Sequence, residues 1–122
     1  MATRTSVVPI QLGQALLGTG YSIVYEVPSG KTGATVRGLV VSNGDVTAGV
    51  PTAHRVWVHM VKDGDSPSIE NALLFDQEFI NGIDGDGVLT MEPGDTIQAK
   101  ADVGSKVGIT VSGAETLTEV IA

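Results

Sequence analysis

The sequence contains no cysteine, so neither a disulfide framework nor a cysteine nucleophile is available. Stability must then come from the hydrophobic core, from association between subunits, or from both. Basic residues are also scarce, because seven Lys and Arg stand against fourteen Asp and Glu and the formal net charge is -7. A nucleic-acid surface needs basic residues that displace counterions from the phosphates. Nucleic acid is therefore not an expected partner.

Aromatic residues make up only 4% of the chain, which leaves little for base stacking. At most one aromatic sugar-binding site can be assembled from those present, which are Tyr21, Tyr25, Trp57, Phe75 and Phe79. Long hydrophobic runs are lacking as well, since the amino terminus does not resemble a signal peptide and no segment reaches the length of a membrane span. We expect a soluble chain with no membrane partner.

Apolar residues and glycines, by contrast, are plentiful. At 122 residues and 42% hydrophobic composition, the chain is long and apolar enough to bury one ordinary core. The 16 glycines are spread along the chain, which indicates frequent turns between short strands. This composition favours an antiparallel β fold in a single domain.

Side-chain alternation and turn signals define the expected strands. Apolar residues alternate with others in residues 21–27, 55–60, 97–101 and 107–112, and residues 34–43 are apolar enough for a central strand. Residues 74–80 and 88–91 read as a strand pair separated by a glycine-rich loop at 81–87, and residues 66–74 are compatible with a short helical turn. Seven or eight short strands predict an all-β fold, a single antiparallel β-sandwich or jelly-roll-like domain. The tail, residues 113–122, is expected to add a last edge strand.

The amino-terminal region differs from the rest. Pro9 cannot donate to a central β ladder, so residues 1–20 are predicted to form an N-terminal arm or edge strand, and residues 21–122 the sandwich domain. An arm of this kind can add a strand to a neighbour's sheet. Its apolar side chains are predicted to contact another subunit or a capsid, and they are Val7, Val8, Ile10, Leu12, Leu16 and Leu17. Deletion of residues 2–17 is expected to leave a folded sandwich that no longer assembles.

No motif with a complete set of catalytic or metal-binding residues is found. The turns Asp63-Gly64-Asp65 and Asp84-Gly85-Asp86 place carboxylates close together, but neither completes a calcium-binding loop. We interpret them as solvated turns, with weak cation binding left open. His54 and His59 lie five apart on one strand and therefore point to opposite faces. We assign no catalytic, cofactor-binding or metal-binding residues, expect no cofactor, and predict a protein that is not an enzyme.

Three segments taken in order resemble small virion proteins of tailed bacteriophages: residues 12–17 (LGQALL), 25–31 (YEVPSGK) and 37–43 (RGLVVSN). The likeness continues at residues 93–97 (PGDTI) and 111–115 (VSGAE), and so spans nearly the whole chain. The resemblance implies a β-sandwich subunit of the virion, such as a capsid decoration (cement) protein or a component attached to the tail. Proteins of this kind commonly form homo-oligomers and carry out no catalysis.

We therefore expect a capsid decoration protein that stabilises the phage head, is made in the host cytoplasm and is located in the virion. Its expected partners are itself, as a homotrimer, and the major capsid protein or another virion protein. A tail-, neck- or fibre-associated subunit is the alternative within this class. A carbohydrate-binding or adhesin module would need an aromatic platform or a complete calcium loop. A jelly-roll enzyme would need a histidine-rich metal set, and the chain has two histidines.

Overall fold

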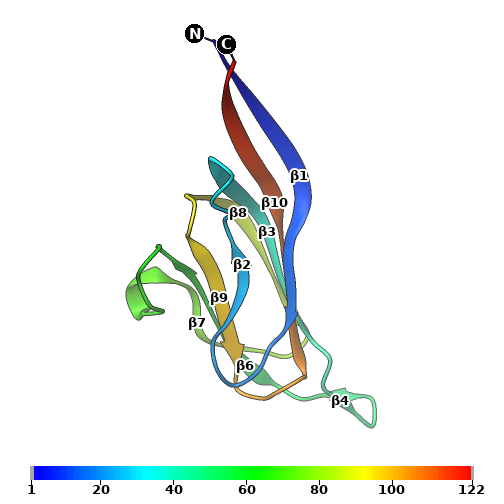
Figure 1. Ribbon diagram of the computed structural model, residues 1–122. Coiled ribbons are helices and arrows are strands. Elements are labelled where there is room, and N and C mark those ends of the chain that lie inside the picture. The colour runs from blue at the N-terminus through cyan, green and yellow to red at the C-terminus, as the bar shows by residue number, and fades with distance from the viewer. Residues whose placement is uncertain (1, 122) are drawn as a thin grey trace.

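The computed structural model describes residues 2–121, apart from the side chains of Asp86 and Ile121, and shows two four-stranded antiparallel sheets packed face to face (Figure 1). Sheet I contains, in spatial order, β1 (Ala2–Leu16), β10 (Val107–Ile121), β3 (Gly33–Asn43) and β8 (Gly82–Met91). Sheet II contains β2 (Ser22–Glu26), β9 (Thr96–Ala101), β6 (His54–Val61) and β7 (Ala72–Phe79). Outside the two sheets lie a small hairpin, β4 (Val46–Thr47) with β5 (Val50–Pro51), and a 3₁₀ turn, η1 (Ile69–Asn71). Within the described residues, no helix is long and apolar enough to cross a membrane.

The strand pairing is that of a long hairpin rolled into a sandwich. Among the eight long strands the first pairs with the last (β1 with β10), the second with the seventh (β2 with β9), the third with the sixth (β3 with β8), and the fourth with the fifth (β6 with β7). This nested order is the jelly-roll arrangement. Ala2 and Ile121 consequently lie opposite one another at the tip of the β1 and β10 pair (Figure 1). The prediction of an all-β antiparallel sandwich is confirmed.

The core forms where the inward-facing residues of the two sheets meet. In sheet I, Val41 lies opposite Ile109, and in sheet II, Val58 lies opposite Ala99. All four side chains are almost completely buried. Burial of each Val or Ile contributes about 1.5–3 kcal/mol relative to exposure. The period-two alternation seen in the sequence therefore positions one face of each strand in the core.

Two local expectations are corrected. The segment 81–87 is not a loop, because β8 begins at Gly82 and pairs with β3 through most of it. The glycines suit this strand: a Cβ at Gly82 would lie 2.9 Å from the carbonyl oxygen of Val41, a contact that only glycine avoids. The tail is not an edge strand throughout, because Gly113 to Thr116 pair with both β1 and β3. The possible helical turn is the 3₁₀ turn η1.

Candidate interaction surfaces

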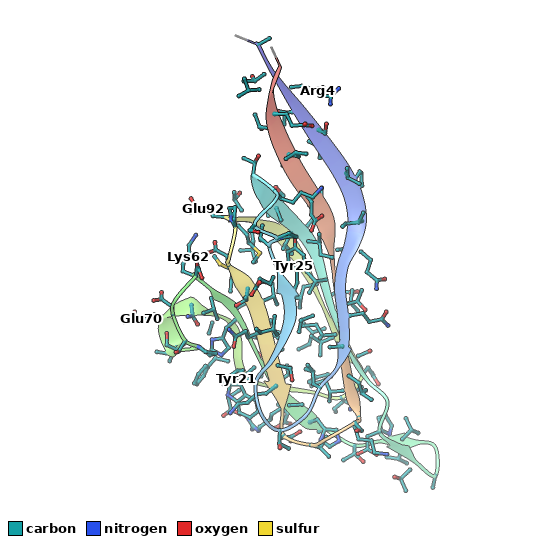
Figure 2. All side chains as sticks on the ribbon, in the orientation of Figure 1. Arg4, Tyr21, Tyr25, Lys62, Glu70 and Glu92 are labelled. Atoms are coloured by element: carbon teal, nitrogen blue, oxygen red, sulfur yellow. The ribbon has the colours of Figure 1, made fainter. Side chains whose placement is uncertain are left out.

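The β1 and β10 pair extends past the end of the sandwich as a ribbon, and the outer part of this ribbon contains only these two strands. The pairing of β10 with β3 ends at Thr116, whereas its pairing with β1 continues, so that residues 2–6 lie opposite residues 117–121. We call residues 2–10 and 113–121 the ribbon; Figure 2 shows Arg4 near its tip. Cross-strand contacts hold it, including an ion pair between Arg4 and Glu119 at 3.4 Å and a hydroxyl hydrogen bond between Thr5 and Thr118 at 3.0 Å. Residues 2–16 thus form an ordered edge strand.

One face of the ribbon continues the inner face of sheet I. The inward-facing Ala34 and Val36 pair with Glu115 and Gly113, which in turn pair with Val8 and Ile10 on β1. Directly paired residues share a face, so Val8 and Ile10 point to the same side as the core. Sheet II does not extend far enough to cover them, and their exposed fractions are 47% and 39%. The ribbon therefore offers an apolar surface beside the end of the core.

Tyr25 closes the core at the base of this surface (Figure 2). It is a buried residue of β2, and its hydroxyl donates a 2.8 Å hydrogen bond to Oε2 of Glu115 on the ribbon. Burial, and then the hydrogen bond to and charge of Glu115, raise the pKa of the phenol above its ordinary value. The bond therefore links sheet II to the ribbon.

The six predicted contact residues do not form one surface. Val8 and Ile10 lie on the inner face of the ribbon, whereas Val7 and Leu16 are exposed on the opposite face. Leu12 is partly buried at a β-bulge and packs against the core. Leu17 is a correction: it is 1% exposed and belongs to the core of its own chain, so it cannot contact another subunit. The sequence prediction missed this because Leu17 follows the last residue of β1, where the chain turns inward. Contact by the exposed residues stays a prediction.

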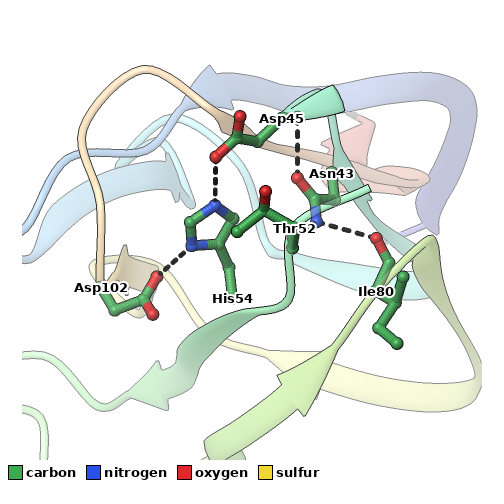
Figure 3. Close-up of polar contacts among 6 residues, drawn as sticks. All are labelled: Asn43, Asp45, Thr52, His54, Ile80 and Asp102. Atoms are coloured by element: carbon green, nitrogen blue, oxygen red, sulfur yellow. Dashed lines mark hydrogen bonds and ion pairs between the residues drawn. The ribbon is translucent and has the colours of Figure 1, made fainter. Parts of the chain in front are cut away.

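His54, the first residue of β6, joins the loops that follow β3 and β9 (Figure 3). Its Nε2 lies 2.7 Å from Oδ2 of Asp45, after β3, and its Nδ1 lies 3.0 Å from Oδ1 of Asp102, after β9. A carboxylate only accepts hydrogen bonds, so both ring nitrogens donate only when the imidazole is protonated. The hydrogen bond to Asp45, with further contributions from Asp102, raises the pKa of His54 against the opposing effect of burial. Both ring nitrogens of His54 are therefore engaged in contacts within the chain.

Asn43 holds the same region together through its side-chain amide. Its nitrogen donates to the carbonyl oxygens of Thr52 and Ile80, at 2.6 and 2.8 Å, and its oxygen accepts from the backbone N–H of Asp45 at 2.9 Å (Figure 3). The end of β3, the segment before β6 and the residue after β7 are therefore linked by one side chain. The arrangement is typical of a structural junction.

His59 lies on the opposite face of β6 and is completely buried. Its Nδ1 is 2.8 Å from the amide oxygen of Asn71, and its Nε2 is 2.9 Å from the hydroxyl of Tyr21. Asn71 Oδ1 accepts, so Nδ1 carries the hydrogen and Nε2 accepts from Tyr21. The two histidines share no hydrogen-bond partner, in keeping with their predicted opposite orientations.

An apolar cavity of about 330 Å³ opens between β7 and β8, at the side of the sandwich away from β1. Its lining includes Val36, Leu39, Leu74, Ile83 and Leu89, with Arg37 as the charged residue. Such a lining accommodates an apolar group and provides no nucleophile with an adjacent base. Among the side chains that the structure describes, no three His, Asp or Glu residues are grouped to hold a metal ion. Asp84 is described, but the side chain of Asp86, in the suggested cation site, lies outside the described residues.

Comparison with known proteins shows a likeness of fold. No family model and no curated protein sequence match this chain. A chain in the acidic stable capsid structure of Helicobacter pylori bacteriophage KHP30 has the same fold with a TM-score of 0.56, at 11% identity, over 98% of this chain and 100% of that one. A chain of infectious bursal disease virus, Gx strain, overlaps 97% of this chain and 32% of its own length at 11% identity, with a TM-score of 0.34 that is too low to establish a common fold. This protein therefore shares its fold, over essentially its whole length, with a component of a phage capsid structure.

Proposed function

We propose that this protein is a non-enzymatic structural component of a bacteriophage particle, and that it decorates the capsid as a homotrimer. The observation that carries the proposal is the fold overlap with a chain from a phage capsid structure, because that overlap leaves almost no residue of either chain unmatched. The sequence segments that resemble phage virion proteins support the same class independently. Since one fold serves many functions, the proposal also requires a surface suited to assembly.

The ribbon supplies that surface. As the edge strand of sheet I, β1 has backbone groups on its free side that can pair with a strand of another molecule. The exposed Val8 and Ile10 lie beside that edge, and each adds about 1.5–3 kcal/mol when buried, before the costs of ordering the partners. The buried polar groups, by contrast, bond to one another within the chain. We therefore assign the function to exposed surfaces such as the ribbon, through which the protein would bind other subunits.

The test is to locate the protein on particles of the phage that encodes it. An antibody raised against the protein should label the whole head surface in electron micrographs. As a control, the same antibody should label isolated trimers. Labelling confined to the tail, neck or fibres would favour the alternative virion role. Absence of the protein from purified particles would contradict both.

A matched pair of variants connects the location to the ribbon. Val8→Asp places a charge on the apolar face of the ribbon, whereas Val50→Asp makes the same change at an exposed valine of the β4 and β5 hairpin. When particles lacking the protein are mixed with purified protein, Val8→Asp should fail to bind and Val50→Asp should bind normally. Equal binding by the two variants would place the attachment surface elsewhere.

A further inference from the structure

The outer face of sheet II gathers aromatic side chains that are far apart in the sequence. Trp57 pairs directly with Lys100, and His59 with Gln98, so these four residues share a face. Val58 and Ala99, between them in sequence, point into the core, which makes this the outer face. The ring of His59 makes edge contacts with Tyr21 and Phe75, with centroids 5.2 and 6.2 Å apart. Three of the five aromatic residues of the chain therefore meet here.

Lys100 places a cation among these rings. Its Nζ lies 4.8 Å from the centroid of Tyr21 and 4.7 Å from that of Trp57, which is cation–π geometry with both. The ion pairs found among the described residues involve Arg4, His54, Arg55 and Lys62, and none involves Lys100. The ammonium group is thus held in a defined position without an acidic partner of its own.

Two rings of this face remain accessible, Tyr21 beside the ammonium group and Phe75 beside His59. Phe75 is 49% exposed and Tyr21 39%, and the neighbouring Ile23 on β2 is also exposed. Exposed apolar surface gathered in one place, in a chain so poor in aromatic residues, is a candidate interaction site. Its chemistry combines apolar, electron-rich ring surface with one fixed positive charge.

We propose that this face binds an acidic sugar, a pyranose that carries a carboxylate, as part of an anionic polysaccharide. The C–H face of the sugar ring packs on the aromatic surface, which is negative at its centre, and the carboxylate pairs with the Lys100 ammonium. A single cation on a protein of net charge -7 matches one carboxylate per binding unit and disfavours densely charged nucleic acid. Such a site goes beyond structural decoration, because it would hold a particle to an acidic glycan.

The experiment uses the one tryptophan of the chain as its reporter. Trigalacturonate is titrated into the purified protein while the fluorescence of Trp57 is followed, and neutral maltotriose serves as the comparison sugar. We expect a saturable fluorescence change with trigalacturonate. Maltotriose should bind at least about tenfold more weakly than trigalacturonate, because it lacks the carboxylate that bonds to the charged Lys100. Added salt should weaken the binding of trigalacturonate and leave that of maltotriose unchanged.

Lys100→Met keeps most of the side-chain stem and removes the charge, so it should reduce the affinity for trigalacturonate about tenfold or more. Lys106→Met, at an exposed lysine of the loop between β9 and β10, makes the same change elsewhere and should bind as the wild type does. If Lys100→Met does not fold, Phe75→Ala, at the exposed edge of the cluster, should weaken binding of both sugars.

Three results would overturn the proposal: no response to trigalacturonate, equal affinity for the neutral sugar, or a fluorescence change caused by protein concentration alone. The last would identify this face as a contact between copies of the chain. Binding of the variants to particles is measured in parallel. If the wild-type protein attaches to particles but does not bind trigalacturonate, only this inference is contradicted. Failure of the wild-type protein to attach to particles would contradict the proposed function.

Discussion

At the residue scale, two buried polar side chains fasten loops at opposite ends of β6. His54 begins the strand and joins the loops after β3 and β9 through Asp45 and Asp102. At the other end, Asp95 accepts hydrogen bonds from the backbone N–H groups of Asp63 and Glu92, at 3.0 and 2.9 Å. Hydrogen bonds to charged, buried groups contribute more than bonds between neutral groups. We therefore expect each side chain to have a measurable effect on stability.

The stabilising contribution of His54 should be lost as the solution becomes alkaline. Its folded-state pKa is raised above the ordinary value of 6.5, so its contribution is fully present below that value and is lost as pH rises through the folded-state pKa. His54→Asn should cost about 1–2 kcal/mol of unfolding free energy at mildly acidic pH. Urea denaturation of the wild type and of His54→Asn, from about pH 5 to pH 9, should show that the difference between their unfolding free energies becomes smaller as pH rises. A difference that is constant with pH would mean that His54 is not protonated between the two carboxylates.

The stabilising contribution of Asp95 should be lost as the solution becomes acidic. Burial alone raises the pKa of its carboxyl group, but the backbone N–H groups of Glu92 and Asp63 and the Lys62 ammonium outweigh this and lower it. Its stabilising contribution is therefore present above the unfolded-state value of 3.8 and is lost as pH falls through the folded-state pKa.

Asp95→Asn should lower the free energy of unfolding at neutral pH by about 1–3 kcal/mol, because an amide nitrogen would replace an accepting oxygen. Asp65→Asn changes an exposed acid in the neighbouring turn and serves as the control. Equal denaturation midpoints for the two variants would contradict the assigned role of Asp95.

At the element scale, β1 has two parts with different roles. Gly13 to Leu16 pair with β10 where β10 also pairs with β3, and they lead into the buried Leu17. Residues 2–6, by contrast, pair only with the end of β10 and cover nothing in the core. The expectation that deletion of residues 2–17 leaves a folded sandwich is therefore revised, because this deletion removes Leu17 and a paired strand.

Deletion of residues 2–6 alone should separate folding from assembly. The sandwich should keep its melting temperature within a few degrees, since no core residue is lost. The shortened protein should nevertheless bind particles more weakly than the wild type, because half of the ribbon tip is missing. Thermal unfolding and particle co-sedimentation measure the two properties. A shortened protein that melts normally and binds normally would exclude the ribbon tip as an attachment surface.

At the scale of the whole molecule, the ribbon leaves apolar surface exposed beside the end of the core. Val8 and Ile10 extend the inner face of sheet I past the end of sheet II, so apolar surface continuous with the core meets solvent. We expect sedimentation equilibrium of the isolated protein to give the mass of a trimer, and the double variant Val8→Asp, Ile10→Asp to give that of a folded monomer. A wild-type protein that is monomeric at all concentrations would contradict the homotrimer.

The local pattern of the sequence determined the strands and the class of fold. Alternation in residues 97–101 and the turn at Pro93-Gly94 predicted β9 closely, because side-chain period and turn chemistry depend on near neighbours. The same reasoning failed for residues 82–87, where many glycines suggested a loop. Pairing with β3 satisfies the backbone of that segment, and pairing between strands distant in sequence is invisible to a local pattern.

The tertiary structure alone decided which side chains are available for function. Leu17 and Leu16 are neighbours of the same type, yet one is buried and the other exposed, since the direction of the chain after β1 depends on where sheet II packs. Tyr21, Trp57 and Phe75 each appeared as an isolated aromatic residue and meet on one face through the rolled-hairpin topology. Composition limited the chain to at most one aromatic site, and only the long-range packing of strands could assemble it.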